Sequence, residues 1–370
     1  MRKLILALMM TVAFLVRGEN YLQFYPTALT FGLNIANVEG RSNTARLAAC
    51  SAMSYAMMYA VVQPIKHLTS ETRPDRSSDD SFPSGHTATA FVGASILHKE
   101  YGLTVSPWYS VAGYGAATAT GVMRVMKNRH WTGDVMVGAG LGIIATEIAY
   151  RLGNILFKDK GLRREELPGY DLADQRPSFI GLSMGMGLGG GTLDFIGSDI
   201  KLKCHTTTTA ALEGAYFFSR HIGAGCKLTA SCTPVSGWEN TTESLEVESS
   251  HLTEYAADTG LYFSFPVSNR LSIGTKALVG VSFVDGVDIN SSNGSVTCDY
   301  LTVDGNATVK YATGLSLTCL DKKNSSWRFF CDIDFSRKRY DLLGNGMTEK
   351  ECCEKNNARV TLGAAYNVIF

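Results

Sequence analysis

The sequence predicts two domains, an all-α helical bundle followed by an antiparallel up-and-down β-barrel of about eight strands. Two observations support this division. Between residues 20 and 155, long apolar stretches rich in Ala, Met and Gly are broken by polar turns, a pattern typical of packed helices. After the polar stretch from Lys158 to Arg176, apolar residues recur at every second position, which is the period of a β-strand.

The first segment of the chain, residues 1–18, is expected to be a secretory signal peptide. Arg2 and Lys3 precede an apolar core from Leu4 to Val16, after which the chain turns polar. A first transmembrane helix is the alternative, but the apolar run is short for a bilayer span. We therefore expect an exported protein with its helical domain over residues 19–157.

Five helices are expected in this domain, over residues 22–37, 43–68, 86–101, 107–126 and 131–152. The stretch from Leu47 to Ile65 contains no charged residue over 19 positions. Its length suits a membrane span, whereas its Ala, Ser and Tyr content suits a buried helix of a bundle. Both interpretations stay open on sequence alone.

A linker is expected over residues 158–176, and the barrel over residues 177–370. In the last twelve residues, one strand face would carry Val360, Leu362, Ala364, Tyr366, Val368 and Phe370, and the other Arg359, Thr361, Gly363 and Asn367. Similar alternation predicts strands near residues 178–190, 208–220, 222–234, 249–266, 270–285, 305–320, 326–340 and 358–370.

The connections between these strands alternate between tight turns and long polar loops. An even number of strands with short turns at one end and long loops at the other is typical of outer-membrane barrels. The terminal Phe370 resembles the last residue of such barrels. A soluble β-sandwich or barrel is the alternative, because the signal from each strand is weak.

Composition excludes some classes of function. The chain has 34 basic and 34 acidic side chains, so no excess of positive charge predicts a nucleic-acid partner. The nine cysteines include no CxxC pair and no Cys/His cluster at zinc spacing, and we expect neither a metal site nor a cofactor. The pairing of these cysteines cannot be predicted from their spacing.

Three segments of the helical half carry the candidate chemistry. Lys66 is followed after six residues by Arg73 and Pro74, in KHLTSETRP. The second segment is PSGH, residues 83–86, and the third is RVMKNRHWTGD, with Arg124, His130 and Asp134. In this order and with these spacings, the segments resemble the three-part signature of the type 2 phosphatidic acid phosphatase (PAP2) superfamily.

Physical chemistry favours a phosphate site at the same residues. Lys66, Arg73 and Arg124 are cations that can stabilise the negative charge on the nonbridging oxygens of a phosphoryl group. Ser84 and Gly85 precede a run that should be helical, so their backbone N–H groups can bind an anion.

The resemblance also implies roles for the remaining motif residues. His130 would attack phosphorus and form a phosphohistidine. Asp134, four residues later, would fix the tautomer of His130, and His86 would act as general acid and then as general base. No metal is required. One departure from the family pattern is Met123, which stands where the family has Ser and removes a hydroxyl donor.

The sequence thus predicts a metal-independent phosphatase of phosphomonoesters, with lipid phosphates as the expected substrates and a membrane as its partner. The helical domain is expected in the periplasm and the barrel in the outer membrane; the inner membrane or the soluble periplasm are the alternatives. Two other functions remain open. One is a nonspecific periplasmic acid phosphatase, and the other is a structural or adhesin barrel protein with an inactive helical domain. The oligomeric state is not predicted.

Overall fold

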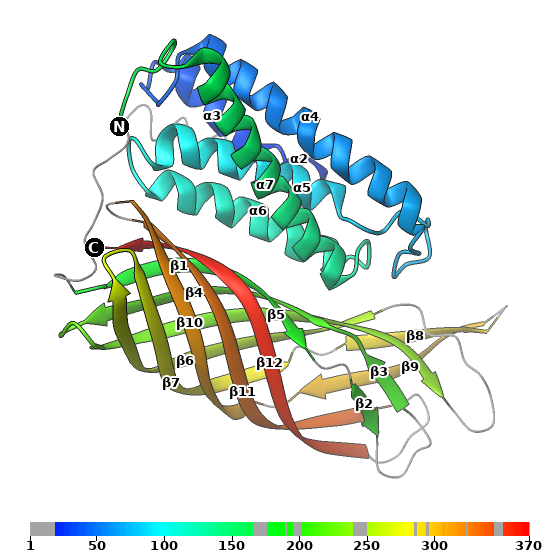
Figure 1. Cartoon of the computed structure of the whole chain (residues 1–370). Coiled ribbons are helices and arrows are strands. Elements are labelled where there is room, and N and C mark those ends of the chain that lie inside the picture. The colour runs from blue at the N-terminus through cyan, green and yellow to red at the C-terminus, as the bar shows by residue number, and fades with distance from the viewer. Residues whose placement is uncertain are drawn as a thin grey trace.

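The computed structural model describes residues 19–165, 176–188, 191–194, 201–239, 250–284, 287–293, 296–305, 307–322, 325–343 and 351–369. The expected signal peptide over residues 1–18, residues 166–175 of the expected linker and the terminal Phe370 lie outside the described residues. The chain forms a helical layer and a β-barrel that lie side by side (Figure 1). The predicted two-domain fold is confirmed.

The five expected helices are present, with small differences at their ends. They are α3 (Tyr25–Ile35), α4 (Thr44–Thr69), α5 (Gly85–Leu97), α6 (Trp108–Met126) and α7 (Thr132–Phe157). A short helix α2 (Glu19–Leu22) precedes α3, and a π-helical turn η1 (His98–Gly102) continues α5. Side chains cap two of these helices, since Asn43 accepts from the backbone N–H of Arg46 at the start of α4, and Ser84 caps α5.

Helix α5 lies at the centre of the bundle, and α7 crosses it closely. A Cβ atom at Gly138 would lie 2.6 Å from the backbone oxygen of Ser84, and one at Gly142 would lie 2.6 Å from that of Ala88. Only glycine permits this approach, because any side chain would collide with the α5 backbone. These two glycines, in the second and third turns of α7, therefore allow α7 to pack directly against the start of α5.

Eight antiparallel strands form the closed barrel, as predicted. They are β1 (Phe179–Leu188), β4 (Thr207–Phe217), β5 (Ile222–Glu239), β6 (Ser250–Ser268), β7 (Leu271–Val284), β10 (Thr308–Lys322), β11 (Ser325–Leu343) and β12 (Glu351–Ile369). The β1–β12 and β10–β11 pairings close the sheet. Two hairpins that the sequence analysis missed, β2 (Gly191–Asp194) with β3 (Lys201–Cys204) and β8 (Val287–Asn293) with β9 (Val296–Gly305), extend two of the long connections.

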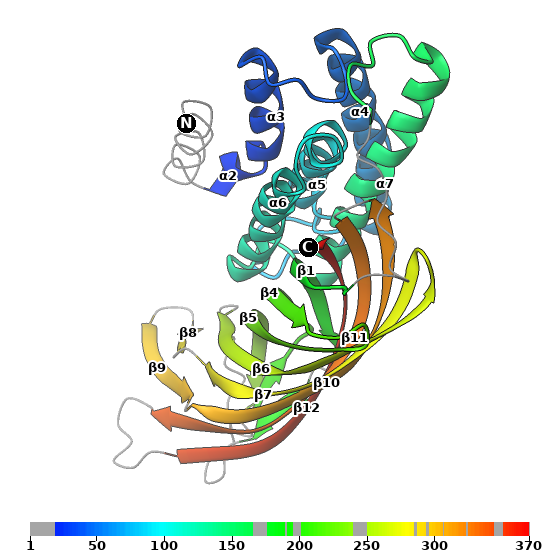
Figure 2. The ribbon, with the colours of Figure 1, turned by 90° about the vertical axis from the view of Figure 1, so that its left-hand side faces the viewer.

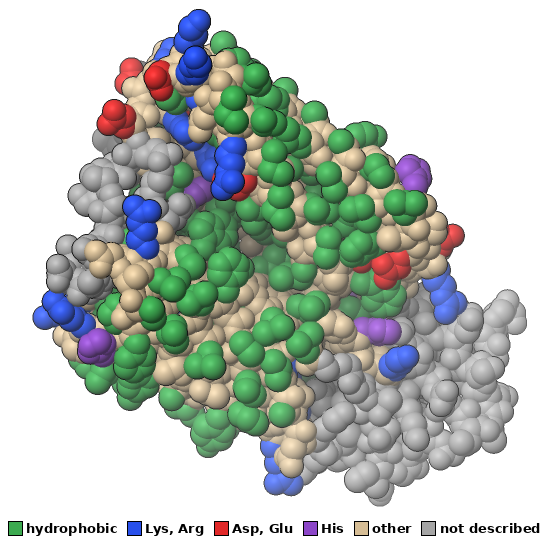
Figure 3. Space-filling model, viewed as in Figure 1, with side chains coloured by type: hydrophobic (Ala, Val, Ile, Leu, Met, Phe, Trp, Pro, Cys, Tyr) green, Lys and Arg blue, Asp and Glu red, His purple; other side chains and the backbone are tan. Residues whose placement is uncertain are grey.

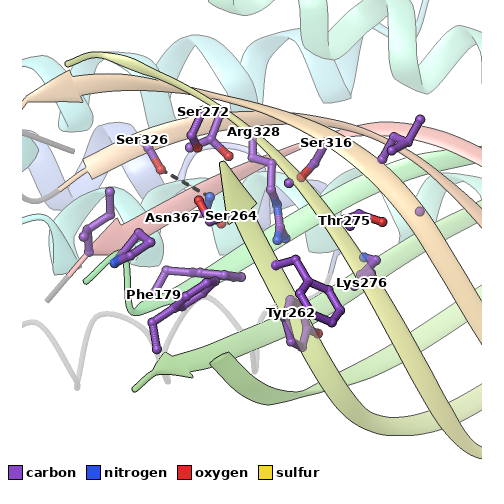
Figure 4. A pocket seen from close by; sticks show the side chains of 18 of the residues that line it. Phe179, Tyr262, Ser264, Ser272, Thr275, Lys276, Ser316, Ser326, Arg328 and Asn367 are labelled. Carbon is purple, nitrogen blue, oxygen red and sulfur yellow. Dashed lines mark hydrogen bonds between the residues drawn. The ribbon is translucent and has the colours of Figure 1, made fainter. Parts of the chain in front are cut away.

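The two faces of the barrel wall differ sharply in polarity. Buried charged side chains lie in the lumen and pair with one another: Lys227 with Asp332 at 2.8 Å, Lys310 with Asp258 at 3.0 Å, and Lys338 with Glu254 at 2.7 Å. A cavity of about 50 Å³ near the short-turn end of the lumen is lined by Phe179, Tyr262, Lys276 and Arg328, among others (Figure 4). Paired charge, rather than apolar packing, thus occupies much of the lumen.

The helical domain contacts the outer face of this wall. Helix α6 lies against β1, β4, β5 and β12 (Figures 1 and 2). The ring of Tyr114 on α6 lies 5.1 Å from that of Trp327 and 5.5 Å from that of Tyr366. Near the first turn of α7, the Thr132 hydroxyl donates to the backbone oxygen of Thr206 at 2.7 Å and accepts from Thr208 at 2.8 Å. The two domains therefore meet along the length of α6.

Candidate active site

The predicted site residues come together at one end of the helical bundle. Lys66 lies in the last turn of α4, and Arg124 in the last turn of α6. Ser84, Gly85 and His86 form the start of α5, whereas His130 and Asp134 flank the start of α7. Arg73 lies in the connector between α4 and α5. Four helix ends thus position seven of the eight residues, and the connector positions Arg73.

His130 is held in a defined tautomer. Its side chain is 1% exposed, and its Nδ1 lies 2.8 Å from the backbone oxygen of Ser81 and 3.5 Å from Oδ2 of Asp134. Since both neighbours accept hydrogen bonds, Nδ1 carries the hydrogen and Nε2 keeps its lone pair. A neutral ring with an unprotonated Nε2 is the form that a nucleophilic imidazole requires.

The surroundings of His130 also keep the ring neutral. Burial lowers the pKa of His130 below its ordinary value of 6.5, because the low-dielectric interior disfavours the imidazolium. The nearby charges of Arg124 and Lys66 act in the same direction, while Asp134 raises the pKa. The net direction is downward, so His130 is neutral at neutral pH.

Asp134 is fixed by contacts from two segments. Its Oδ2 accepts a hydrogen bond from the backbone N–H of Trp131 at 2.9 Å and another from the hydroxyl of Ser81. Its backbone oxygen accepts from the N–H of Ser84 at 3.0 Å. Ser81 was missed in the sequence analysis, although it contacts both His130 and Asp134; its only sequence signal is a hydroxyl three positions before Ser84.

The start of α5 lies directly beside Lys66. A Cβ atom at Gly85 would lie 3.8 Å from Cε of Lys66, so the lysine side chain passes over the helix N-terminus. Ser84 is fully buried, and its hydroxyl accepts from the backbone N–H of Thr87 at 3.4 Å. This hydroxyl therefore caps the helix. His86, the second residue of α5, is half-buried in the same turn.

The three predicted cations act on one another. The charges of Arg73 and Arg124 repel Lys66, whereas the carboxylates of Asp80 and Asp134 attract it. Arg124 is 6% exposed, and such crowding of buried positive charge is unfavourable unless an anion joins it. The cluster therefore has the electrostatic character of a phosphate site.

Asp80 is the second residue that the sequence analysis missed. Its carboxylate pairs with Arg73 at 2.9 Å, and its backbone oxygen accepts a hydrogen bond from Lys66. A hydrogen bond from Ser78, aided by the charges of Arg73 and Lys66, lowers the pKa of Asp80 although burial opposes this. Its side chain is 51% exposed. Asp80 thus places a negative charge at the cations that a phosphate would bind.

The other residues near the motif have structural roles. Met123 packs against the apolar cluster of Leu22, Tyr25, Leu29 and their neighbours. Asp75 pairs with Arg129 at 2.9 Å and stabilises the connector. Over the ranges that the structure describes, no group of three or more His, Cys, Asp or Glu side chains could hold a metal ion.

Comparisons with known proteins identify the helical domain. Residues 47–157 match the family model described as PAP2 superfamily. Over 148 residues, 40% of this chain, the sequence is 38% identical to a lipid A 1-phosphatase of Porphyromonas gingivalis. The match covers 33% of that relative, so the chain spans about a third of the relative's length.

Two solved structures are also similar. The outer membrane protein OprG from Pseudomonas aeruginosa is 11% identical with a TM-score of 0.38, over 54% of this chain and 98% of that one. LpxE from Aquifex aeolicus is 22% identical with a TM-score of 0.29, over 40% of this chain and 86% of that one. Within the helical half of this chain, residues 47–157 therefore form a PAP2 superfamily domain.

Proposed function

We propose that this protein is a phosphatase that hydrolyses the phosphomonoesters of lipids through a phosphohistidine intermediate, without a metal. The observation that carries this proposal is the state of His130, whose Nδ1 is bound by Ser81 beside Asp134. Its Nε2 is thereby left as the nucleophile, next to a cluster of cations at a helix N-terminus. The name of the P. gingivalis relative supports a phosphorylated glycolipid such as lipid A as the substrate.

The first step would transfer the phosphoryl group to the enzyme. The lone pair of His130 Nε2 forms a bond to phosphorus as the bond from phosphorus to the ester oxygen breaks. His86 donates its proton to the leaving oxygen, which departs as an alcohol. Lys66, Arg73 and Arg124, with the N–H groups at the start of α5, stabilise the negative charge on the nonbridging oxygens. Asp134 stabilises the positive charge that develops on the His130 ring.

The second step would return the enzyme to its starting state. His86, now neutral, removes a proton from a water molecule whose oxygen attacks phosphorus. The bond between phosphorus and Nε2 breaks, and its electron pair returns to the His130 ring. Inorganic phosphate leaves, and His86 is again protonated for the next ester.

The barrel would hold this chemistry at a lipid surface. A closed barrel leaves no strand edge unpaired, and its outward side chains are apolar, as an outer-membrane anchor requires. We propose that residues 177–370 anchor the catalytic domain, residues 19–157, in the outer membrane. Tethering raises the effective concentration of a lipid substrate at the site.

The test is phosphate release by the purified full-length protein from lipid A, phosphatidic acid and soluble phosphomonoesters, with and without EDTA. We expect release from a lipid phosphate in either condition, loss of that release in His130→Ala, and full release in the control His67→Ala, since His67 is an exposed neighbour of Lys66. Strong inhibition by EDTA that a divalent ion reverses would contradict the metal-independent mechanism. Equal rates on soluble esters would favour a nonspecific phosphatase, and no turnover would favour a structural role.

A further inference from the structure

Most charged residues of the helical domain lie towards its two ends; the exceptions within α7 are Glu147, which pairs with Lys99 at 2.7 Å, and Arg151. The stretches Leu47–Ile65 in α4 and Leu103–Met123 around α6 contain no Asp, Glu, Lys or Arg. The catalytic cluster lies at one end of these stretches, and Arg46 and Lys99 lie at the other. Nineteen helical residues rise about 28 Å, close to the ~30 Å of bilayer hydrocarbon. Among the described residues, α4 and α7 are long and apolar enough to cross a membrane.

The exposed surface between these ends is largely apolar, and the partly exposed Glu147 and the exposed Arg151 of α7 lie towards the end that is opposite the catalytic cluster. On α7, an outward stripe consists of Ile144, Ile148, Leu152 and Ile155, which recur every three or four residues and therefore share one face. Ile155 is 70% exposed, and Tyr59 on α4 is 63% exposed. Figure 3 shows hydrophobic side chains spread across both the helices and the barrel, with many of the charged side chains towards the ends of the helical layer. A continuous apolar surface of this kind indicates contact with lipid rather than water.

The barrel wall links this surface to the membrane. Outward side chains such as Leu212, Ile273, Val281 and Phe329 are about half exposed, as a lipid-facing wall requires. Helix α6 packs on this same wall, where it buries the outward side chains of Met184 and Tyr366. If the wall lies in lipid, a helical layer that lies along it also lies in lipid.

The register of the strands places the catalytic end at one boundary of the membrane. Thr208, which donates to Thr132, pairs with Cys232, and Cys232 pairs with Thr253. Thr253 is two residues from Tyr255, whose outward ring lies 5.7 Å from that of Phe283. Outward aromatic rings form girdles at the two interfaces of such barrels. Here the opposite girdle includes Phe218 and Phe265 beside the short turns.

The girdle at Tyr255 lies on the side of the long connections. The strands that pass it lead to the β2–β3 and β8–β9 hairpins, whereas the short turns join β4 to β5, β6 to β7 and β10 to β11 at the other end. In outer-membrane barrels the short turns face the periplasm and the long loops face outward. The catalytic end therefore lies towards the outer leaflet.

We propose that the helical domain lies within the outer membrane beside the barrel, and that its active site opens to the phosphorylated lipids of the outer leaflet. The identity of the ester as substrate rests on the proposed function, but the position in lipid does not. The contacts of α6 favour this position over the periplasmic one that the sequence analysis expected.

The first experiment measures contact with lipid. The full-length protein is reconstituted in phospholipid vesicles that carry a diazirine on the acyl chain, then photolysed and digested with trypsin. We expect label on the peptides of residues 47–66 and 130–151, which contain the outward faces of α4 and α7. Label on barrel peptides alone would overturn the membrane position. Hydrolysis of lipid phosphate in the same vesicles reports the proposed function separately, so either can fail without the other.

The second experiment measures which leaflet the site faces. An epitope is inserted after Ser77, in the exposed connector of the catalytic end, or after Asp159, in the exposed turn that follows α7. Heat-modifiable migration verifies that each barrel is folded. We expect antibody to detect the Ser77 epitope on intact cells and the Asp159 epitope only after permeabilisation. Detection of the Ser77 epitope only after permeabilisation would overturn the outer-leaflet assignment.

Discussion

Buried positive charges occur in both halves of the molecule, but their partners differ. In the barrel lumen, the amino groups of Lys227, Lys310 and Lys338 each lie within 3.0 Å of a carboxylate. In the catalytic end of the helical domain, the partly buried Lys66 bonds to the backbone oxygen of Asp80; the charges of Asp80 and Asp134 attract it, and those of Arg73 and Arg124 repel it. The comparison teaches that the lumen cations are each held by buried carboxylates, whereas the catalytic cations crowd one another and share the half-exposed carboxylate of Asp80.

The first prediction tests this difference between the two regions directly. Arg73→Gln should lower kcat/KM by roughly 10²- to 10³-fold, because a donor to the transition-state charge is lost. Its folding should not change, since Arg73 lies in an accessible connector. The measurement pairs steady-state kinetics with urea unfolding of the heat-modifiable form.

The matched variant in the lumen should behave in the opposite way. Lys310→Met leaves the carboxylates of Asp258 and Asp334 buried without their shared cation, and should destabilise the barrel by about 3–5 kcal/mol. Activity per folded molecule should be unchanged. If Lys310→Met lost activity while its barrel kept full stability, the lumen charges would not be structural.

A second prediction distinguishes the contribution of the Asp134 carboxylate to catalysis from that of the Ser81 hydroxyl. Asp134→Asn should lower kcat by roughly 10²-fold, because the ring of His130 loses the carboxylate that stabilises its developing positive charge. Ser81→Ala removes one hydrogen bond to Asp134 but keeps the backbone oxygen that binds His130, so a loss of about tenfold is expected. An equal loss in both variants would show that Ser81 acts directly on the substrate.

The pH profile should report the lowered pKa of His130. The neutral nucleophile should persist to a pH below 6.5, so the acid limb of kcat/KM that belongs to His130 should lie below that value. Because the folded state disfavours the protonated ring, the His130 contribution to stability is present above pH 6.5 and is lost as pH falls through the lower folded value. Asp134→Asn should move this limb to still lower pH, since Asp134 raises the pKa. A limb that moves upward would contradict this electrostatic account.

The smallest expected effect concerns Asp80. Asp80→Asn should lower KM by roughly two- to fivefold, because the carboxylate no longer competes with phosphate for Arg73. Inorganic phosphate should inhibit this variant more strongly than the wild type. Asp79→Asn is the control, as Asp79 accepts a hydrogen bond from the hydroxyl of Thr72 in the same connector. The same decrease in KM in both variants would indicate a general effect of connector charge.

Motif spacing and side-chain period predicted much of this molecule. The order and spacing of three short motifs, through their resemblance to the PAP2 signature, grouped Lys66, Arg73 and Arg124 with His130. The two-residue period predicted which side chains of β12 share a face, and Arg359 and Thr361 are indeed buried on the opposite face to the partly exposed Leu362. Both signals come from residues that are close together within short segments, so a single sequence is sufficient to detect them.

Features that depend on tertiary contact could not be predicted in this way. His130 is bound by the backbone oxygen of Ser81, which the path of a turn brings close to the ring. Since every residue has a backbone oxygen, the sequence does not indicate which one will make this contact. His98, in η1, lies in the domain interface with its ring 5.2 Å from that of Tyr366. The contact between α6 and the barrel requires two complementary surfaces, neither of which is marked in its own segment.

The most direct test of the account is to trap the phosphorylated enzyme during turnover. Full-length protein is mixed with a ³²P-labelled lipid phosphomonoester, quenched with alkali, digested with trypsin and mapped. The account predicts an acid-labile, alkali-stable label on the peptide of residues 130–151, in which His130 is the single histidine. Label on the peptide of residues 77–99, which contains His86, or undiminished turnover by His130→Ala, would contradict it.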